Sequence, residues 1–262
     1  MVQENSRRDV VSSSNTTVAI VGAGPGHPEL LTLRALRRIE SADVILYDRL
    51  VSAEILALAN PNAEFIYCGK DEGHQEAVQN EIFRLLVDRA SQGLKVVRLK
   101  GGDPFIFGRG AEEAELLAEH GIAAEIVPGV TSALSAPALA RIPVTYRGLA
   151  RSVAVVTGRC RGGEIEDWRK VALVDTLVIL MGVKHRAKIA AQLIACGRPA
   201  HQPVAFIENG STPQERIVIA TLETVSELEV ESPAVWVCGD VVEKRFNHAF
   251  LQQLLKAEEA NA

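Results

Sequence analysis

A run of glycines, an acid, a proline and an arginine over residues 100–113 combines residue types that can hold a small ligand. The run follows a strand predicted over 95–99, and in open α/β sheets ligands bind at the carboxyl ends of the strands. Gly101 and Gly102 let a ligand approach the backbone, and Asp103 can accept hydrogen bonds from its hydroxyl or amino groups. A simple turn needs one glycine, whereas this run holds four. The pattern therefore predicts a binding loop.

The elements that position this loop alternate between strand and helix. Short β-branched runs predict strands, and helical periodicity fills the intervals. The predicted strands are 17–21, 44–47, 64–67, 95–99 and 124–127, and the predicted helices are 29–40, 53–59, 76–91 and 111–120. This order predicts a mostly parallel sheet with helices on both faces.

The second half of the chain starts a new set of strands. These are predicted over 152–157, 177–181, 203–208, 216–220 and 234–238. No helix separates the strands 203–208 and 216–220, which favours an antiparallel hairpin. The fold class is α/β with two α/β domains. We expect a disordered tail (1–15), an N-terminal domain (16–140), a connector (141–150) and a C-terminal domain (151–262).

Composition excludes several classes of protein. The 262 residues are 47% hydrophobic and 23% charged, with a net charge of −5. This balance argues against nucleic acid as the main partner, and no apolar run reaches the length of a membrane span. The four cysteines form no CxxC pair. They predict reduced thiols in a cytoplasmic protein with no metal centre.

The glycine-rich segment 22–26 raises one alternative, a nicotinamide oxidoreductase. A dinucleotide fingerprint needs a third glycine and free N–H groups at a helix start. Here His27 stands at the third glycine position, and Pro25 has no N–H to donate. Asp48 lies near the distance expected for a ribose-binding acid, so the alternative stays open but disfavoured.

Five motifs in order resemble those of the tetrapyrrole methylases, from about residue 17 to residue 242. They are VGAGPGHPELLT (21–32), YDRLV (47–51), LKGGDPFIFGRG (99–110), VPGVTS (127–132) and IPVTYR (142–147). Within the family they most resemble the enzymes that methylate uroporphyrinogen III. A sister methylase acting on a later corrin precursor is the nearest alternative.

The resemblance implies a reaction. A methyl group would pass from S-adenosylmethionine to carbons 2 and 7 of uroporphyrinogen III. The product would be precorrin-2, formed by way of precorrin-1, with S-adenosylhomocysteine released. The family also implies a homodimer, a role in sirohaem or cobalamin biosynthesis, and an active site in the cleft between the two domains.

The resemblance assigns catalytic roles to three residues. Asp48 becomes a candidate proton acceptor, where its alternative is a surface or capping acid. Lys70 becomes a proton donor or carboxylate contact, where its alternative is a solvated lysine; the family usually has arginine at the next position, where this chain has Asp71. Arg109 becomes a tetrapyrrole contact or an aid to proton removal, where its alternative is a salt bridge with Glu112 at the helix start.

The resemblance also implies two sets of binding residues. The substrate set is Arg109, Glu112, Arg147 and Met181. The cofactor set is Pro25, Gly101, Gly102, Asp103, Ile106, Thr131, Ser132, Met181, Gly210 and Ala234. Thr131 and Ser132 could equally cap a helix, and Met181 could equally fill a core. Uroporphyrinogen carries eight carboxylates, which arginine binds well. The arginines at 141, 147, 151, 159 and 161 therefore form either a substrate-binding group or a solvated basic stretch.

Overall fold

The computed structural model describes residues 16–69, 75–159 and 167–246. The expected tail at 1–15, Lys70 and Asp71 lie outside these ranges. Backbone contacts divide the chain into two compact units. The first comprises residues up to Gly24 and Pro28–Gly129, and the second comprises Pro25–His27 and the residues from Val130 onward. Within the described ranges, no helix is both long and apolar enough to cross a membrane.

The first unit is built on a five-stranded sheet in the order β3-β2-β4-β1-β5, with every pairing parallel. The strands are β1 (Thr16–Gly22), β2 (Val44–Tyr47), β3 (Glu64–Tyr67), β4 (Val96–Lys100) and β5 (Ala123–Val127). The helices are α1 (Leu33–Glu40), α2 (Ala53–Leu56), α3 (Gln75–Ser91) and α4 (Gly110–Glu119). The predicted parallel sheet is confirmed.

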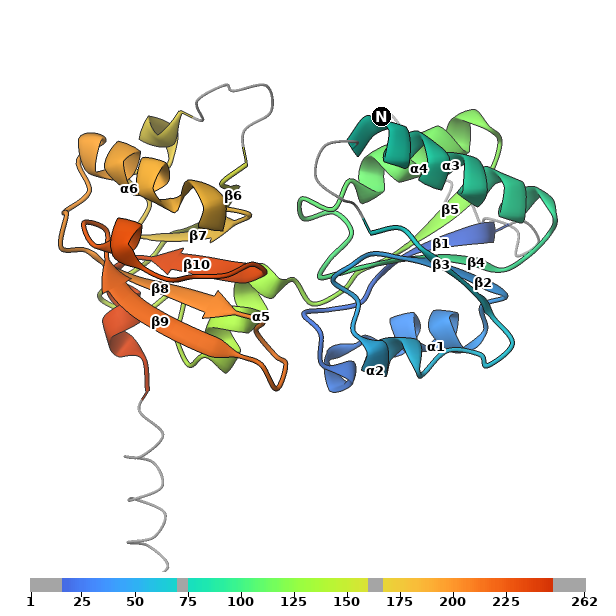
Figure 1. Cartoon of the computed structure of the whole chain (residues 1–262), viewed down its shortest axis with the longest axis horizontal. Helices are drawn as coiled ribbons and strands as arrows, with labels where there is room; N and C mark the ends of the chain where they lie inside the picture. The colour runs from blue at the N-terminus through green and yellow to red at the C-terminus, as the bar shows by residue number, and fades with distance from the viewer. Residues whose placement is uncertain (1–15, 70–74, 160–166, 247–262) are drawn as a thin grey trace, which may run out of the picture. The chain divides into compact units, whose positions relative to one another are not determined.

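Helices cover both faces of this sheet because its inner strands β1, β2 and β4 bury side chains on both faces. Successive side chains point to opposite faces of a strand. Val97 and Leu99 of β4 pack with α1 and α2, whereas Val96 packs on the other face with α3 and α4. Figure 1 shows the two helix pairs on opposite sides of the sheet. Arg98 and Lys100 share the face of Val96, and both are buried.

The second unit is built on a five-stranded mixed sheet in the order β6-β7-β10-β8-β9. Its strands are β6 (Val153–Thr157), β7 (Thr176–Leu180), β8 (Pro203–Glu208), β9 (Arg216–Thr221) and β10 (Ala234–Cys238). Only β6 and β7 pair in parallel; the predicted antiparallel pairing of β8 with β9 is confirmed. Its helices are α5 (Ser132–Leu139) and α6 (Arg186–Ala195).

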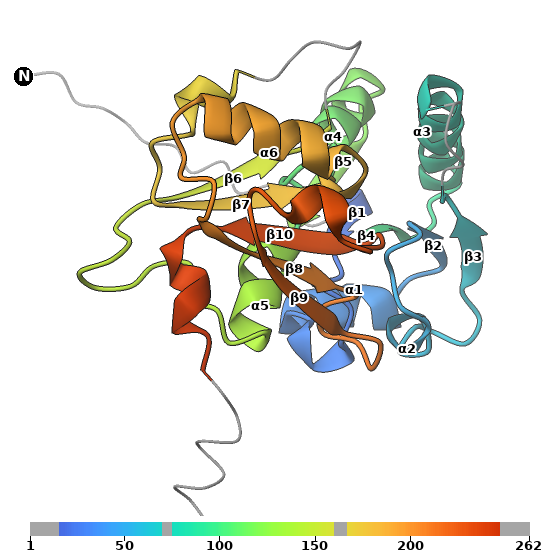
Figure 2. The same ribbon diagram turned by 60° about the vertical axis from the view of Figure 1, so that its left-hand side comes forward.

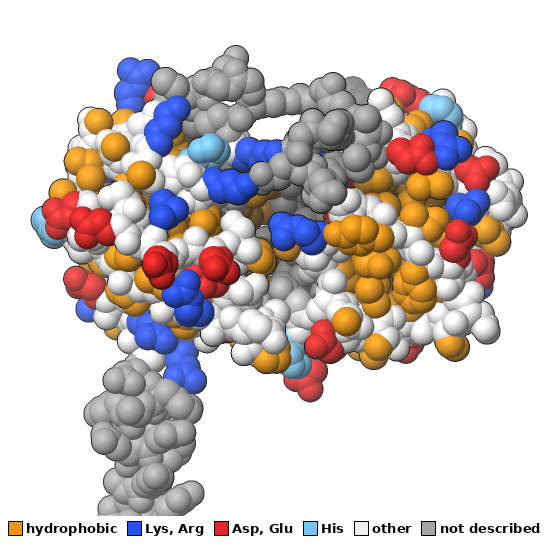
Figure 3. All heavy atoms as spheres, viewed as in Figure 1, with side chains coloured by type: hydrophobic (Ala, Val, Ile, Leu, Met, Phe, Trp, Pro, Cys, Tyr) orange, Lys and Arg blue, Asp and Glu red, His pale blue; other side chains and the backbone are white. Residues whose placement is uncertain are grey.

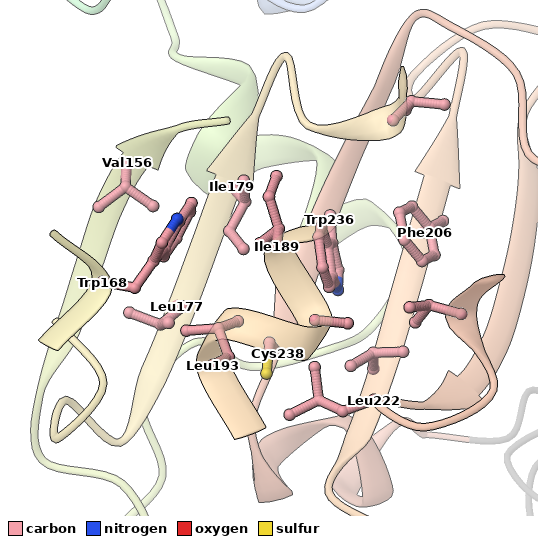
Figure 4. Packing of buried hydrophobic residues seen from close by; sticks show 14 of the residues in the cluster. Val156, Trp168, Leu177, Ile179, Ile189, Leu193, Phe206, Leu222, Trp236 and Cys238 are labelled. Atoms are coloured by element: carbon pink, nitrogen blue, oxygen red, sulfur yellow. The ribbon is translucent and has the colours of Figure 1, made fainter. Parts of the chain in front are cut away.

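The core of the second unit lies on both faces of its sheet. On one face α6 packs over Leu177, Phe206 and Trp236, and Figure 4 shows these side chains pointing toward the helix. The Phe206 and Trp236 rings stack with centroids 4.9 Å apart. On the other face α5 supplies two buried alanines, Ala133 and Ala136, to a second cluster, and its C-cap Ala140 joins them. Figure 2 shows α5 and α6 on opposite sides of the sheet.

Two features differ from the expectations. The contact division falls at Val130, earlier than the connector expected at 141–150, because α5 packs on the second sheet. The helix expected over 29–40 is broken, because the Thr32 hydroxyl accepts a hydrogen bond from the Ala35 amide and starts α1 at Leu33. A short 3-10 turn (Pro28–Leu30) precedes this cap.

Candidate active site

Three glycines bring the backbone together at the carboxyl edge of the first sheet. Gly22 ends β1, and Gly102 and Gly129 follow β4 and β5, which pair on either side of β1. A methyl group on Gly129 would lie 2.3 Å from the Gly102 carbonyl oxygen, and one on Gly22 would lie 2.6 Å from it. Gly102 also exchanges two backbone hydrogen bonds with Gly24, of 2.7 and 3.1 Å. No side chain fits where these loops meet.

The Asp103 carboxylate links two loops at this edge of the sheet by hydrogen bonds. Its Oδ1 accepts a hydrogen bond from the Phe105 amide at 2.8 Å, and its Oδ2 accepts one from the Gly129 amide at 3.1 Å. The carboxylate therefore ties the loop after β4 to the loop after β5. Its expected contact with a ligand stays a prediction, and each oxygen keeps a further lone pair for it.

The rest of the binding loop is fixed by a backbone hydrogen bond and carries exposed apolar side chains. The amide of Gly110 donates to the Pro104 carbonyl at 2.9 Å. Phe105 and Ile106 are exposed large apolar residues. Arg109 adopts a left-handed backbone with φ 60° directly before α4, and its Nε donates to Glu112 Oε2. The pairing of Arg109 with Glu112 that the sequence allowed is thus present, with both side chains open to solvent.

Asp48 lies at the same edge, one residue past β2, and its carboxylate meets a buried arginine. Arg98 Nη2 donates to Asp48 Oδ1 at 2.5 Å. Lys100 Nζ lies 3.8 Å from Asp48 Oδ2. The side chain of Asp48 is 29% exposed, whereas those of Arg98 and Lys100 are 2% and 4% exposed. Asp48 is therefore the part of this ion cluster that a ligand can reach.

Sequence reasoning missed the buried members of the cluster, which are Arg98, Lys100 and Glu113. Glu113 of α4 is 1% exposed, and its Oε1 accepts from Arg98 Nε at 3.3 Å and Lys100 Nζ at 3.0 Å. One signal was available: two charges at alternate positions of a strand that is otherwise buried. Lys and Arg are rarely fully buried unless paired.

The pKa directions follow from burial and charge. Burial lowers the pKa of Lys100, and Arg98 lowers it further, so its pKa lies below the ordinary value although Glu113 and Asp48 oppose this. Burial also acts to lower the pKa of Arg98, but Asp48 and Glu113 outweigh it and the pKa is raised. The cluster therefore keeps Arg98 charged and makes Lys100 its more readily deprotonated cation.

The second unit gathers three of the expected residues at one edge of its sheet. Met181 directly follows β7, Gly210 lies two residues past β8, and Ala234 begins the antiparallel β10. The Asn209 amide donates to the Pro233 carbonyl at 3.0 Å, which ties the last two segments together. A methyl group on Gly210 would lie 2.9 Å from the Ala136 side chain of α5, so only glycine fits.

Pro25, Thr131 and Ser132 belong to the same unit. Thr131 is the N-cap of α5, and its hydroxyl accepts from the Ala133 amide; Ser132 is the first helical residue. The capping role that the sequence allowed for Thr131 is therefore present. Near Pro25, the His27 amide donates to the Ser211 hydroxyl at 3.2 Å.

Arg147 is exposed in a tight loop that the Tyr146–Ala150 backbone bridge closes. Three other arginines of the basic stretch, at 141, 151 and 159, are described, and Arg161 is not. Figure 3 shows basic and acidic side chains interspersed on the visible face. Substrate binding by the arginine group stays a prediction.

Backbone strain concentrates in the loops expected to bind ligand. Six non-glycine residues in the described part of the chain have positive φ. Five of them lie in the loops after β4, β7 and β8: Phe107, Arg109, Met181, Asn209 and Ser211. Such strain persists only where the surroundings enforce it, and it clusters at functional sites.

The described residues include no group of three or more His, Cys, Asp or Glu side chains placed to hold a metal ion. What the fold does provide is two α/β units, each with constrained glycine loops at one sheet edge. That arrangement defines a protein that binds small molecules at strand ends.

Comparison with known proteins identifies the family. The chain matches the family of Tetrapyrrole (Corrin/Porphyrin) Methylases over residues 17–226. It belongs to this family, which confirms the resemblance found in the sequence and sets the nicotinamide alternative aside.

Three similar proteins show which members of the family this chain resembles. The uroporphyrinogen-III C-methyltransferase of Bacillus subtilis is 47% identical over 92% of this chain and 97% of its own. The Thermus thermophilus uroporphyrin-III C-methyltransferase, solved with S-adenosylhomocysteine, is 49% identical with a TM-score of 0.76, over 86% of this chain and 98% of that one. The sirohaem synthase of Pseudomonas aeruginosa is 48% identical over 90% of this chain, which spans 52% of that protein.

Proposed function

We propose that this protein transfers methyl groups from S-adenosylmethionine to carbons 2 and 7 of uroporphyrinogen III. The product is precorrin-2, formed by way of precorrin-1, and S-adenosylhomocysteine is released. The observation that carries the proposal is the 47% identity to the Bacillus enzyme over 97% of that enzyme's length. The aligned region covers 92% of this chain and therefore contains every loop described above.

The side chains present fit an adenosine-based methyl donor. Ile106 and Met181 are 40% and 46% exposed, and each lies in a strained or glycine-rich loop. Loops of this kind offer backbone N–H and C=O groups to the polar parts of a ligand, and apolar side chains cover its rings. The residues proposed to hold the donor are Pro25, Gly101, Gly102, Asp103, Ile106, Thr131, Ser132, Met181, Gly210 and Ala234.

When bound, S-adenosylmethionine supplies an activated methyl group on its sulfonium. The protein then has to orient the electron-rich pyrrole carbon toward it and exclude water. Arg109 and Arg147 are exposed, and in the proposal they pair with substrate carboxylates, with Glu112 steadying Arg109. Each of these contacts fixes the orientation of the macrocycle.

Methylation leaves a proton that must depart from the macrocycle, and a positioned base assists its removal. Asp48 is the candidate we favour, because its carboxylate is partly exposed at the carboxyl edge of the sheet while one oxygen is fixed by Arg98. Lys70, which lies outside the described residues, and Arg109 are the other candidates for moving protons.

The test is anaerobic incubation of the purified protein with uroporphyrinogen III and S-adenosylmethionine, followed by mass and absorption spectra of the product. We expect a gain of two methyl groups. No methylation, in a sample that binds S-adenosylhomocysteine by calorimetry, would contradict the proposal and favour a sister methylase acting on a later corrin precursor.

A homodimeric state and a cytoplasmic location belong to the same proposal, with no nucleic acid or membrane as partner. Light scattering on the eluting peak of a size-exclusion column measures the oligomeric state directly. A monomer with full activity would remove the dimer from the proposal and leave the reaction intact.

A further inference from the structure

The ion cluster beside Asp48 is placed by the central strand of the first sheet. Arg98 and Lys100 occupy alternate positions of β4, so both side chains leave the same face of the sheet. That face is otherwise covered by apolar side chains of α3 and α4. Taking charges out of water is expensive, and a buried ion cluster is often no more stabilising than an apolar replacement. Its presence at this edge therefore needs a reason other than stability.

The guanidinium of Arg98 is fixed at all three of its nitrogens. Nη2 donates to Asp48 Oδ1 at 2.5 Å, and Nε donates to Glu113 Oε1 at 3.3 Å. Nη1 donates to two backbone carbonyls, those of Leu46 at 3.4 Å and Leu99 at 3.3 Å. A planar group held at three points has one orientation.

Glu113 holds the buried end of the cluster. Its Oε1 accepts hydrogen bonds from Arg98, from Lys100 and from Gln79 Nε2, the last at 3.1 Å. Two cations and two carboxylates balance in charge. Glu113 therefore fixes the two cations, and the two cations face Asp48.

Only one end of the cluster is open. The Asp48 side chain is 29% exposed, whereas the other three are between 1% and 4% exposed. Arg98 occupies Asp48 Oδ1, and the nearest cation to Oδ2 is Lys100 Nζ at 3.8 Å, beyond hydrogen-bond distance. One oxygen is thus anchored by a hydrogen bond. The other makes the longer ion pair with Lys100 and no hydrogen bond to a described residue, so it is the oxygen placed to accept a proton.

We propose that Arg98, itself held by Glu113, is a positioning residue that fixes the Asp48 carboxylate for proton removal during methyl transfer. This inference rests on the proposed function, because it assigns Asp48 the role of base. Arg98 acts through Asp48 and contacts neither the donor nor the tetrapyrrole. A purely structural cluster would instead change stability and leave the catalytic step alone.

The first variant is Arg98→Lys, which keeps the charge and loses the planar fork. We expect kcat to fall about 10- to 100-fold, the loss typical of a misplaced catalytic group. KM for both substrates and the affinity for S-adenosylhomocysteine should stay within about threefold of the wild-type values. Glu113→Gln, which keeps the shape of the side chain, should lower kcat in the same direction and carries the test if Arg98→Lys does not fold.

The decisive measurement is a double-mutant cycle with Asp48→Asn, followed with radiolabelled methyl donor so that slow turnover is counted. If Arg98 acts through Asp48, Arg98→Lys causes no further loss in the Asp48→Asn background. The proposal would be overturned if Arg98→Lys lowered kcat equally in the wild-type and Asp48→Asn backgrounds. It would also be overturned if kcat were unchanged in Arg98→Lys alone or in Asp48→Asn alone.

A matched control is Arg198→Lys in the second unit. Arg198 is also buried, and it donates to Gln202 Oε1 at 2.6 Å and to the Val174 carbonyl. This variant should lower stability by a similar amount and leave kcat unchanged. Wild-type turnover of uroporphyrinogen III, measured in the same series, separates failure of this inference from failure of the proposed function.

Discussion

At the scale of single residues, the unusual feature of Met181 is its backbone. It directly follows β7, has φ 56° and leaves its side chain 46% exposed. A non-glycine residue in this region is strained, by about 1–3 kcal/mol, and an exposed methionine gains little from burial in return. Because packing does not account for the backbone strain at Met181, we interpret its side chain as positioned to contact a ligand.

Replacing Met181 by glycine or by alanine separates the strain from the side chain. Both variants lose the thioether, but only alanine keeps the backbone penalty. We expect Met181→Gly to be more stable than Met181→Ala by about 1 kcal/mol in urea unfolding. Ala111→Gly in α4 should show the opposite order of glycine and alanine. Equal stability of the two Met181 variants would contradict a strained backbone at this position.

Arg109 allows a test of substrate binding as distinct from donor binding. Its side chain is 39% exposed, and among the described residues it pairs only with Glu112, so Arg109→Ala should barely change stability. We expect kcat/KM for the tetrapyrrole to fall about 10- to 100-fold, since a charged hydrogen bond contributes about 1.5–3 kcal/mol. Calorimetry should give nearly the same affinity for S-adenosylhomocysteine.

The control for Arg109 is Arg84→Ala in α3. Arg84 forms the same kind of exposed pair, with Glu81 three residues away, and is not part of the candidate site. It should leave turnover and binding unchanged. If Arg109→Ala weakened S-adenosylhomocysteine as strongly as it slowed turnover, Arg109 would belong to the donor site.

At the scale of secondary structure elements, the sequence predicts most of the framework. The predicted spans of β2, β3, β8 and β10 match the structure end for end, because each is a β-branched or aromatic run bounded by turn residues. The loops of the candidate site were also predicted, because glycine and proline mark them and strand ends locate them. Helix α6 was not predicted, although its buried face packs on the second sheet.

Local pattern could not predict what depends on tertiary contact. The pairing of Arg98 with Glu113 joins a strand to a helix, and nothing in the spacing of the two residues reveals it. The same holds for Asp103, whose bond to the Gly129 amide spans 26 residues. The unit boundary at Val130 follows from the packing of α5, which a proline- and glycine-containing connector at 141–150 does not indicate.

The glycine crossing, where Gly22, Gly102 and Gly129 meet at the ends of β1, β4 and β5, can be tested directly. Gly129→Ala would place a methyl group 2.3 Å from the Gly102 carbonyl oxygen. We expect it to destabilise the protein by about 1–3 kcal/mol and to weaken S-adenosylhomocysteine at least tenfold in calorimetry, because the two loops must separate.

Gly93→Ala is the control for this crossing. Gly93 lies in the turn before β4, at the opposite edge of the sheet, and has φ 76° with open space around it. Its strain should lower stability by about 1 kcal/mol while leaving the affinity unchanged. Equal affinities in the two variants would show that the crossing does not shape the donor site.

At the scale of the whole molecule, acidic residues outnumber basic ones, 33 to 28. Among the residues that the structure describes, four carboxyl groups have pKa values below their ordinary range in the folded state: Glu81, Asp167, Asp175 and Glu208. A lowered folded pKa adds stability above the unfolded value, and this is lost as the pH falls through the folded pKa. The molecule should therefore lose stability on the acid side, below about pH 4.

Glu208 should dominate this loss, because it is the buried member of the four. Burial acts to raise its pKa, but two hydrogen bonds from Arg216, at 2.6 and 2.7 Å, and one from the Glu231 amide at 2.7 Å outweigh burial and lower it. We expect Glu208→Gln to reduce the free energy of unfolding at pH 7 by about 1.5–3 kcal/mol and to flatten its decline between about pH 5 and pH 3. Glu81→Gln, which removes an exposed carboxylate, should leave both the stability at pH 7 and its decline toward low pH nearly unchanged. Urea unfolding across this pH range measures both, and a wild-type decline that persists in Glu208→Gln would place the acid sensitivity elsewhere in the chain.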